Sequence, residues 1–438
     1  MKNTVKVRIY PTDEQKEVLS KAFGCARWFW NNSLSETNRL YKETGKGLSQ
    51  QRMNDRLPAL KKEFEWLAEP YSQVLQSVSL NLSRAFINFF EGRAKYPKFK
   101  SKHGKQSIQY PQNVKLLDKA IKLPKLGEIP AKIHRLFEGK LKTVTVSLTN
   151  SGQYFASLLF DDGKPELAKS QDGKAVGIDL GLTDFVVTSD GSKFANPRHL
   201  RKHEKNLKRK HHKLSRKQKG SNRRNKARRL VARVHARISN VRKDFLHKLS
   251  RKIVNENQVL CVENLAVKNM VKNHNLAKAI SDCGWSEFTT MLKYKAEKEG
   301  KIYVEVDRFF PSSKTCHVCL SQIGRLPIEV RSWNCFHCQT KHDRDVNAAI
   351  NIRDEGLRLL ALGTSDPASG GNVRPAARCC PPVPGGQVTQ PRGRKTSVSA
   401  ILVETGSPIR HLLRGSSRSG MARSKDKRRC PEFYARTA

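Results

Sequence analysis

The sequence predicts a multidomain protein that combines α/β and α+β architecture. Strand-like and helix-like patterns alternate along residues 1–362, and an apolar fraction of 37% in 438 residues allows two or three domains with modest cores. No apolar run reaches the ~18 residues of a membrane-spanning helix, and the first residues have a strand pattern that is not typical of a signal peptide. We therefore expect a cytoplasmic protein with no membrane partner.

The N-terminal part begins with a half-buried strand, because apolar and polar side chains alternate over the first ten residues. Thr12 and Gln15 then have the spacing of a capping box at the start of a helix. Helical patterns dominate up to residue 92, and strand patterns follow at 106–110, 113–123, 141–149 and 153–160. This order predicts a β-barrel made of 1–10 and 96–170, interrupted by a helical lobe at 11–95.

Aromatic residues and lysines are interleaved in the segment Tyr-Pro-Lys-Phe-Lys-Ser-Lys at 96–102. Such a segment can hold a nucleic-acid strand by stacking and charge, which makes Lys98 and Lys100 candidate contacts. A solvated linker is the alternative interpretation.

The second half of the chain carries strands, a strongly basic block and helices in the order of one α/β domain. Three strand patterns lie at 176–180, 185–188 and 192–195, and a basic block at 198–229 continues into a long amphipathic helix. A strand, a helix, a strand and a last helix follow at 259–262, 286–299, 302–306 and 347–360. This succession predicts an RNase H-like domain, a mixed sheet flanked by helices, over 171–310 and 343–362.

The charge of the chain indicates a polyanionic partner. It carries 84 Lys and Arg against 39 Asp and Glu, a formal charge of +45, which exceeds what solubility requires. The block 198–229 holds sixteen of these cations and one acid, Glu204. We expect phosphate contacts from this block and association with the nucleoid, with a solvated helix face as the alternative. The candidate contacts are Lys208, Arg209, Lys210, Arg223, Arg224, Arg228 and Arg229. Residues 363–438 are rich in Gly, Pro and Ser, which predicts a disordered basic tail without a catalytic role.

Three acidic residues occupy positions where a sheet can bring them together. Asp179 and Glu263 end two apolar strands, and Asp345 opens the last helix. A cluster of carboxylates suits a pair of Mg²⁺ or Mn²⁺ ions, a common device for phosphodiester hydrolysis. The alternative is three unrelated surface acids. Asp343 competes for the third position, and we favour Asp345 because it immediately precedes the helix.

Four cysteines have the spacing of a structural zinc site. The pattern is Cys-x2-Cys-x15-Cys-x2-Cys, formed by Cys316, Cys319, Cys335 and Cys338. Four thiolates close the coordination sphere, so one zinc ion should hold the segment 311–342 without taking part in hydrolysis. Three histidines nearby are alternative ligands, namely His317, His337 and His342.

Together these motifs resemble the TnpB (OrfB) proteins of bacterial insertion sequences over about residues 5–362. The resemblance is carried by GIDLGLTDF, by VENL followed by Lys268-Asn269-Met270, by SSKTCxxC, and by a second CxxC followed by HDRDVNAAINI. It implies an RNA-guided double-strand DNA endonuclease that cuts next to a short motif read by its N-terminal domains. It also implies a RuvC domain with Asp179, Glu263 and Asp345 as metal ligands, a wedge-like β-barrel, a helical recognition lobe, and a guide RNA from the element's own end. The segment 311–342 corresponds to a zinc ribbon that binds the target.

Two residues and the long tail past residue 362 depart from the family pattern, and several alternative functions accompany the resemblance. Leu320 and Gln339 replace the glycine that often follows each CxxC pair, which could alter the two knuckle turns. A transposase that cuts and joins ends without RNA, a DNA-binding regulator with an idle site, and a compact CRISPR effector are the alternative functions. A transposase encoded in the same element is a candidate partner.

Overall fold

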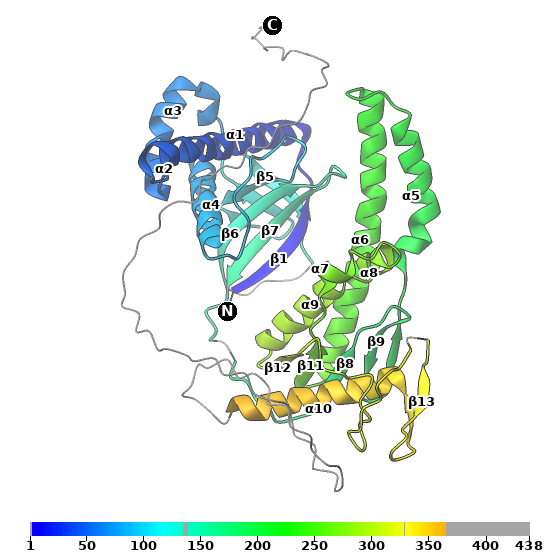
Figure 1. The fold of residues 1–438 in the computed structure, drawn as a ribbon. Helices are drawn as coiled ribbons and strands as arrows, with labels where there is room; N and C mark the ends of the chain where they lie inside the picture. The colour runs from blue at the N-terminus through cyan, green and yellow to red at the C-terminus, as the bar shows by residue number, and fades with distance from the viewer. Residues whose placement is uncertain (1, 135–138, 166, 328, 365–438) are drawn as a thin grey trace, which may run out of the picture. The chain divides into compact units, whose positions relative to one another are not determined.

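The computed structural model describes residues 2–134, 139–165, 167–327 and 329–364, so the predicted tail lies outside the described residues except for its first two positions. These residues form two β-sheets with covering helices and one small hairpin (Figure 1). The structure therefore agrees with the prediction of mixed α and β architecture. Among the described helices, none is both long and apolar enough to cross a membrane.

The N-terminal sheet is antiparallel throughout its described pairings and has seven strands. Its order is β2-β6-β7-β1-β5-β4-β3, which puts the first strand of the chain in the middle. The strand bounds are β1 Lys2–Ile9, β2 Gln106–Tyr110, β3 Lys115–Leu116, β4 Ala120–Leu123, β5 Gly127–Lys132, β6 Lys140–Leu148 and β7 Tyr154–Asp161. The patterns predicted these strands except β5, whose sequence Gly-Glu-Ile-Pro-Ala-Lys has little alternation and contains a proline, which weakens a strand pattern.

Helices of the same part bury their apolar faces against this sheet. They are α1 Asp13–Thr44, α2 Gln50–Asp55, α3 Leu57–Glu63, a 3₁₀ turn at Glu65–Ala68, and α4 Ser72–Phe90. The capping box at the start of α1 is present, since Thr12 Oγ1 accepts from the Gln15 N–H at 3.2 Å and Gln15 Oε1 accepts from the Thr12 N–H at 3.0 Å. Leu19 and Leu75 are fully buried in one core with the strands.

The second sheet is mixed and has the order β10-β9-β8-β11-β12. Its strands are β8 Ala175–Asp179, β9 Asp184–Thr188, β10 Lys193–Ala195, β11 Val259–Glu263 and β12 Ile302–Val306. Strands β8, β11 and β12 are parallel, and β9 and β10 run antiparallel at one edge. The prediction that the first strand of this domain is central, with the fourth beside it, is confirmed.

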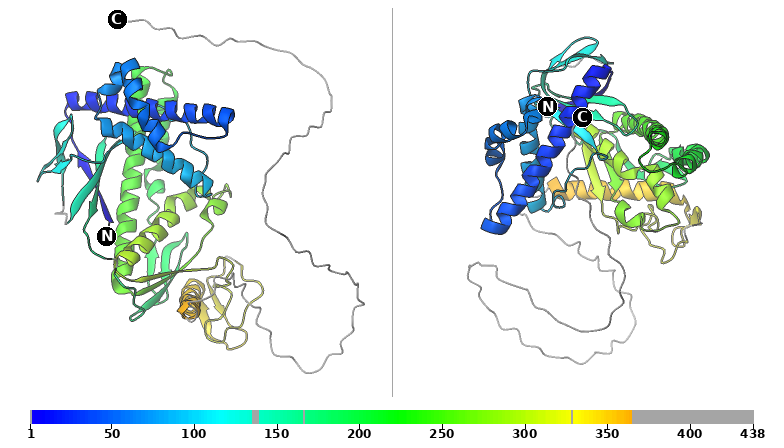
Figure 2. Two further views of the ribbon diagram at one scale, coloured as in Figure 1. Left: turned by 90° about the vertical axis from the view of Figure 1, so that its left-hand side faces the viewer. Right: turned by 90° about the horizontal axis from the view of Figure 1, so that it is seen from above.

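Helices cover both faces of this sheet (Figures 1 and 2). On one face, α6 Asn222–Glu256 and α9 Trp285–Lys298 pack on Val176 and Ile178. On the other face, α10 Arg344–Thr364 packs on Val259 and Cys261. Gly177 lies under α10, where a Cβ atom would collide with the backbone oxygen of Ala349. The helix that carries Asp345 is thus in close contact with the strand that carries Asp179.

The basic block differs from the prediction of a block leading into one long helix. It forms α5 His199–Ser215, then a turn, and the first residues of α6, so that the two helices pack together. Gly220 adopts a positive φ of 88° in this turn, and Ser221 caps α6 by accepting from the Arg224 N–H at 3.1 Å. The patterns also missed two short helices, α7 Val267–Met270 and α8 Ala277–Cys283, and the hairpin of β13 Ser332–Asn334 and β14 Lys341–Asp343.

Candidate active site

Asp179 and Glu263 lie side by side at the carboxyl end of the central strands. The parallel register pairs Ile178 with Val262, so the next residue on each strand is one of the two acids. Burial, and after it the charges of Glu263 and Asp345, raises the pKa of Asp179 to about 7. Burial also raises the pKa of Glu263. The three acids therefore share one electrostatic environment, although they come from segments far apart in the sequence.

The carboxyl groups of this site are chemically suited to divalent cations. A bound cation relieves the electrostatic cost of a buried carboxylate that has other acids near it, and oxygen donors are the ligands that Mg²⁺ and Mn²⁺ prefer. Among the described residues, the group whose ligand atoms gather closely enough to be recognised as a metal cluster is that of the four cysteines, and the three acids are not part of it.

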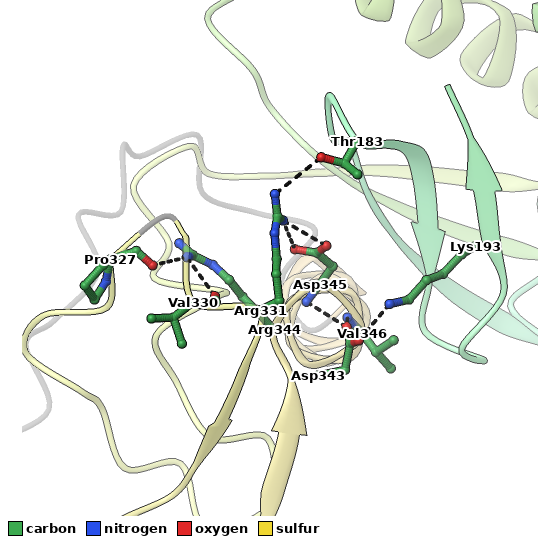
Figure 3. A network of polar contacts seen from close by, with 9 residues as sticks. All are labelled: Thr183, Lys193, Pro327, Val330, Arg331, Asp343, Arg344, Asp345 and Val346. Atoms are coloured by element: carbon green, nitrogen blue, oxygen red, sulfur yellow. Dashed lines mark hydrogen bonds and ion pairs between the residues drawn. The ribbon is translucent and has the colours of Figure 1, made fainter. Parts of the chain in front are cut away.

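Asp345 is held by an arginine from the cysteine-rich segment (Figure 3). The guanidinium of Arg331 lies 3.2 and 3.3 Å from the two Asp345 oxygens and also donates to Thr183 Oγ1 at 3.4 Å. This ion pair places a positive charge beside the Asp345 carboxylate. Sequence patterns could not reveal this contact, because it joins three separate segments.

Asp343 serves as the cap of α10. Its Oδ1 atom accepts from the N–H groups of Asp345 and Val346, both at 3.1 Å, and its Oδ2 atom lies 2.7 Å from Lys193 Nζ (Figure 3). The carboxylate of Asp343 is thus engaged by the start of α10 and by Lys193, whereas that of Asp345 is engaged by Arg331.

The four cysteines form a compact cluster. Their Sγ atoms lie within 4.8 Å of one another, with 3.6 Å between Cys316 and Cys338 and 3.5 Å between Cys319 and Cys335. Tetrahedral zinc with Zn–S bonds of ~2.3 Å requires sulfur separations of ~3.8 Å, so the cluster fits the ion. His342 lies outside this ligand set, but its Nε2 atom is 3.1 Å from Cys316 Sγ and can donate a hydrogen bond to a thiolate.

The knuckle turns keep their geometry without glycine. Leu320 and Gln339 adopt positive φ angles of 61° and 59°. Their N–H groups donate to the carbonyls of Cys316 and Cys335, both at 2.9 Å. The two departures from the family pattern therefore introduce backbone strain but leave the turns intact.

Two buried asparagines of α10 attach the cysteine-rich segment to the sheet domain. Asn347 Nδ2 donates to the carbonyls of Ser312 and Thr315 at 3.4 and 2.8 Å, and Asn351 Nδ2 donates to the same two at 2.8 and 2.6 Å. Asn347 Oδ1 also accepts from the His317 N–H at 3.1 Å. Sequence reasoning missed both residues, although their positions four apart on one helix face were visible.

The basic hairpin of α5 and α6 exposes most of its cations. No residue of α5 is buried. Lys208 pairs with Glu204 at 3.1 Å, and Arg209 donates to Asn206. Arg224 differs, because its guanidinium donates to the carbonyls of Leu214 and Lys217 and so holds the turn of the hairpin. The remaining candidates are exposed or half-buried on the same two helices, namely Lys210, Arg223, Arg228 and Arg229.

The segment with Lys98 and Lys100 is fixed to α1, so it is not a free linker. Trp30 Nε1 donates to the Lys98 carbonyl at 3.0 Å. Asn31 Nδ2 donates to the Lys100 carbonyl at 2.9 Å, and Asn31 Oδ1 accepts from the Lys100 N–H at 2.7 Å. Lys100 Nζ lies 3.7 Å from the Trp30 ring centroid, and burial followed by the charge of Lys105 lowers its pKa to about 8.

A cavity of about 300 Å³ lies between α1, α4 and β2 next to this segment. Sequence analysis did not identify it, because its lining comes from several separate elements. The polar and aromatic groups that line it include Arg27, Trp30, Asn81, Lys100, Gln106 and Gln109.

Comparison with known proteins gives this arrangement a family. A family described as "Probable transposase" (OrfB_IS605) matches residues 158–274, a "Cas12f1-like, TNB domain" matches 285–352, and a "Helix-turn-helix domain" (HTH_OrfB_IS605) matches 1–46. The last range holds strand β1 and the single helix α1 in this structure, with no helix-turn-helix.

Two relatives resemble the chain over most of its length. A Streptomyces pristinaespiralis protein named "Putative RNA-guided DNA endonuclease" is 44% identical over 372 residues, 83% of this chain and 91% of the relative. "Putative RNA-guided DNA endonuclease InsQ" of Escherichia coli K12 is 31% identical over 381 residues, 82% of this chain and 93% of the relative.

A solved structure is similar in fold. The protein in the cryo-EM structure of a Cas12f1–sgRNA–target DNA complex superposes with a TM-score of 0.51 at 13% identity, over 81% of this chain and 98% of that one. The fold and the family and relative matches together define a protein of the insertion-sequence OrfB class. The chain belongs to the TnpB (OrfB) family of the IS605 type, which is related to Cas12f.

Proposed function

We propose that this protein is an RNA-guided endonuclease that cuts double-stranded DNA next to a short motif, with Asp179, Glu263 and Asp345 as its catalytic metal ligands. The observation that carries the proposal is the position of Asp179 and Glu263 side by side at the ends of two paired parallel strands, with Asp345 on the helix that packs on them. The raised pKa of Asp179, caused by burial and by the charges of the other two acids, is consistent with a site for divalent cations. The names of the relatives support the same activity.

The proposed enzyme has four domains and a tail, and the presence of two separate sheets supports this division. Residues 171–310 and 343–362 form the RuvC-like nuclease domain, and 311–342 form a zinc ribbon that binds the target. Residues 1–10 and 96–170 form a wedge-like β-barrel, and 11–95 form the recognition lobe. The tail 363–438 has no assigned role in this scheme.

The residues of the site have separate tasks in this mechanism. Two Mg²⁺ or Mn²⁺ ions, when bound, would supply an activated water and positive charge for the leaving 3′ oxygen. Asp179 of the central strand, Glu263 of the strand beside it and Asp345 at the start of α10 would hold these ions. Arg331 would have to release Asp345 before that carboxylate could bind an ion, since both of its oxygens now accept from the guanidinium.

The nucleic-acid partners would use surfaces outside the metal centre. The exposed cations of α5 and α6 suit the phosphates of a guide RNA or of its duplex with target DNA, because such contacts do not depend on sequence. The polar cavity beside Trp30 suits the base edges of the short DNA motif, because amide and guanidinium groups read such edges. Sequence choice would come from guide pairing, with the guide transcribed from the element's own end.

Cleavage by matched variants tests the metal-site assignment. Purified protein with guide RNA should cut a matching plasmid in Mg²⁺, and Asp179→Ala should abolish cutting while RNA binding stays near the wild-type level. Asp354→Asn is the control, because Asp354 is an exposed acid on α10 that pairs with Arg353. Equal cutting by Asp179→Ala and the control would refute the assignment.

A further inference from the structure

Phe309, just beyond strand β12, leaves 86% of its surface exposed, the highest value among the large hydrophobic side chains of the described residues. Single exposed apolar residues are common on protein surfaces, so exposure alone has no functional meaning. Its position, its rigid backbone and its charged surroundings distinguish Phe309 from the others.

The position of Phe309 is set by the sheet that carries the acids. The last residue of β12, Val306, pairs in register with Glu263, and its carbonyl accepts from the Asn264 N–H at 3.0 Å. Phe309 follows three residues later, within a backbone reach of ~10 Å. Phe309 therefore lies near the same end of the sheet as Asp179 and Glu263.

The backbone around Phe309 is fixed. Its N–H donates to Asp307 Oδ1 at 2.8 Å, and the N–H of Phe310 donates to the Asp307 carbonyl at 3.1 Å. Phe310 packs inward against the cluster that contains Val306 and Ile352. Of these two neighbouring aromatic residues, Phe310 thus contacts the core, whereas Phe309 is exposed to solvent.

The surroundings of the ring suit a nucleic-acid strand. Arg308 precedes Phe309 in the chain and is exposed as well, so an aromatic side chain is followed back along the chain by a cation that can attract a phosphate. Base–aromatic stacking contributes ~1–3 kcal/mol per base and tolerates any base, as an enzyme that cuts at guided positions requires.

We propose that Phe309 stacks on a base of the DNA strand being cut, beside the scissile phosphate, and holds that strand at the carboxylates. Phe309 is thus a substrate-positioning residue at the nuclease centre. This inference rests on the proposed endonuclease function and adds a contact that selects strand conformation without selecting sequence.

Fluorescence of 2-aminopurine tests the stacking directly. Full-length protein with guide RNA is bound to target DNA that carries 2-aminopurine at successive positions around the cut, in an Asp179→Asn background to prevent cleavage. Phe309 should quench the probe at one or two adjacent positions, Phe309→Ala and Phe309→Leu should lose this quenching, and Phe309→Tyr should keep it. Tyr294→Ala is the control, because Tyr294 is an aromatic residue of α9 that is 44% exposed and has no role in the proposed mechanism.

Cleavage kinetics test the positioning role. With Asp179 intact, Phe309→Ala should slow cleavage by about 5- to 150-fold, the factor that corresponds to the stacking energy of one base, and Phe309→Tyr should restore it. Quenching that is unchanged in Phe309→Ala refutes the stacking, and an unchanged cleavage rate refutes the positioning. If Asp179→Ala still cuts, the metal-site proposal fails, whereas position-specific quenching by Phe309 would still stand as an independent result.

Discussion

Replacing both Asn347 and Asn351 by alanine should weaken the attachment of the cysteine-rich segment to α10 by more than the two single substitutions together. Both side chains are almost fully buried, and both donate to the carbonyls of Ser312 and Thr315. Each carbonyl has two lone pairs, so either asparagine alone can still satisfy both acceptors.

The expected magnitudes follow from this redundancy. Asn351→Ala should lower the free energy of unfolding by about 1 kcal/mol, the net value of a typical hydrogen bond. Asn347→Ala should cost about 2 kcal/mol, because it also removes the acceptor of the His317 N–H. The loss of unfolding free energy in the double variant should exceed the sum of the two single losses by at least about 1 kcal/mol. Only in the double variant do both carbonyls lose every amide partner.

Thermal unfolding and chelator-driven zinc release measure this coupling in a double-mutant cycle. Zinc should leave the double variant fastest, and guided cleavage should fall as well because Asp345 lies on the same helix turn as Asn347. Asn275→Ala, an exposed site, is the control. Strictly additive effects of the two substitutions would refute the shared-acceptor reasoning.

Three further outcomes are expected. In the folded protein, burial and then the charge of Glu263 raise the pKa of Asp179 from 3.8 to about 7. The contribution of protonated Asp179 to the free energy of unfolding is therefore complete below about pH 4 and is lost as the pH rises through 7. In metal-free buffer, Asp179→Asn should abolish this loss between pH 4 and 7, and an unchanged pH profile of the melting temperature would argue against a buried, coupled carboxyl. Replacing both Leu320 and Gln339 by glycine should relieve left-handed strain and raise stability by about 0.5–1 kcal/mol per site with one zinc retained, and a lower melting temperature would contradict this. The double variant Arg209→Glu, Lys210→Glu should weaken the binding of unrelated nucleic-acid sequences to the same extent. The slope of the logarithm of the binding constant against that of the salt concentration should fall by the amount expected for about two phosphate contacts. Weaker binding of one sequence alone would mean that α5 reads bases.

The second sheet could be predicted in detail because its strands are short apolar runs that end in acids. Buried parallel strands need apolar residues on both faces, so patterns such as Val259–Glu263 stand out. The four cysteines were equally visible, because zinc ligation requires a fixed spacing at each knuckle. Both predictions depend on local sequence, and the structure places those residues accordingly.

Contacts between distant segments could not be predicted. The ion pair of Arg331 with Asp345 depends on how the hairpin folds back on α10, and nothing near Arg331 in the sequence indicates a partner. The division of the basic block into α5 and α6 was missed because lysine and arginine favour helix throughout, and only Gly220 and Ser221 mark the turn. Weakly patterned elements such as β5 gain their stability from neighbouring strands and not from propensity.

The most direct test of the central claim is to purify the protein from cells that carry its flanking DNA and to sequence the RNA that accompanies it. The proposed function predicts one discrete RNA with a constant scaffold and a variable end, and DNA that matches this end should be cut by the complex in Mg²⁺. Heterogeneous RNA that salt removes, with no guided cleavage, would contradict it and favour a transposase or regulator that acts without a guide.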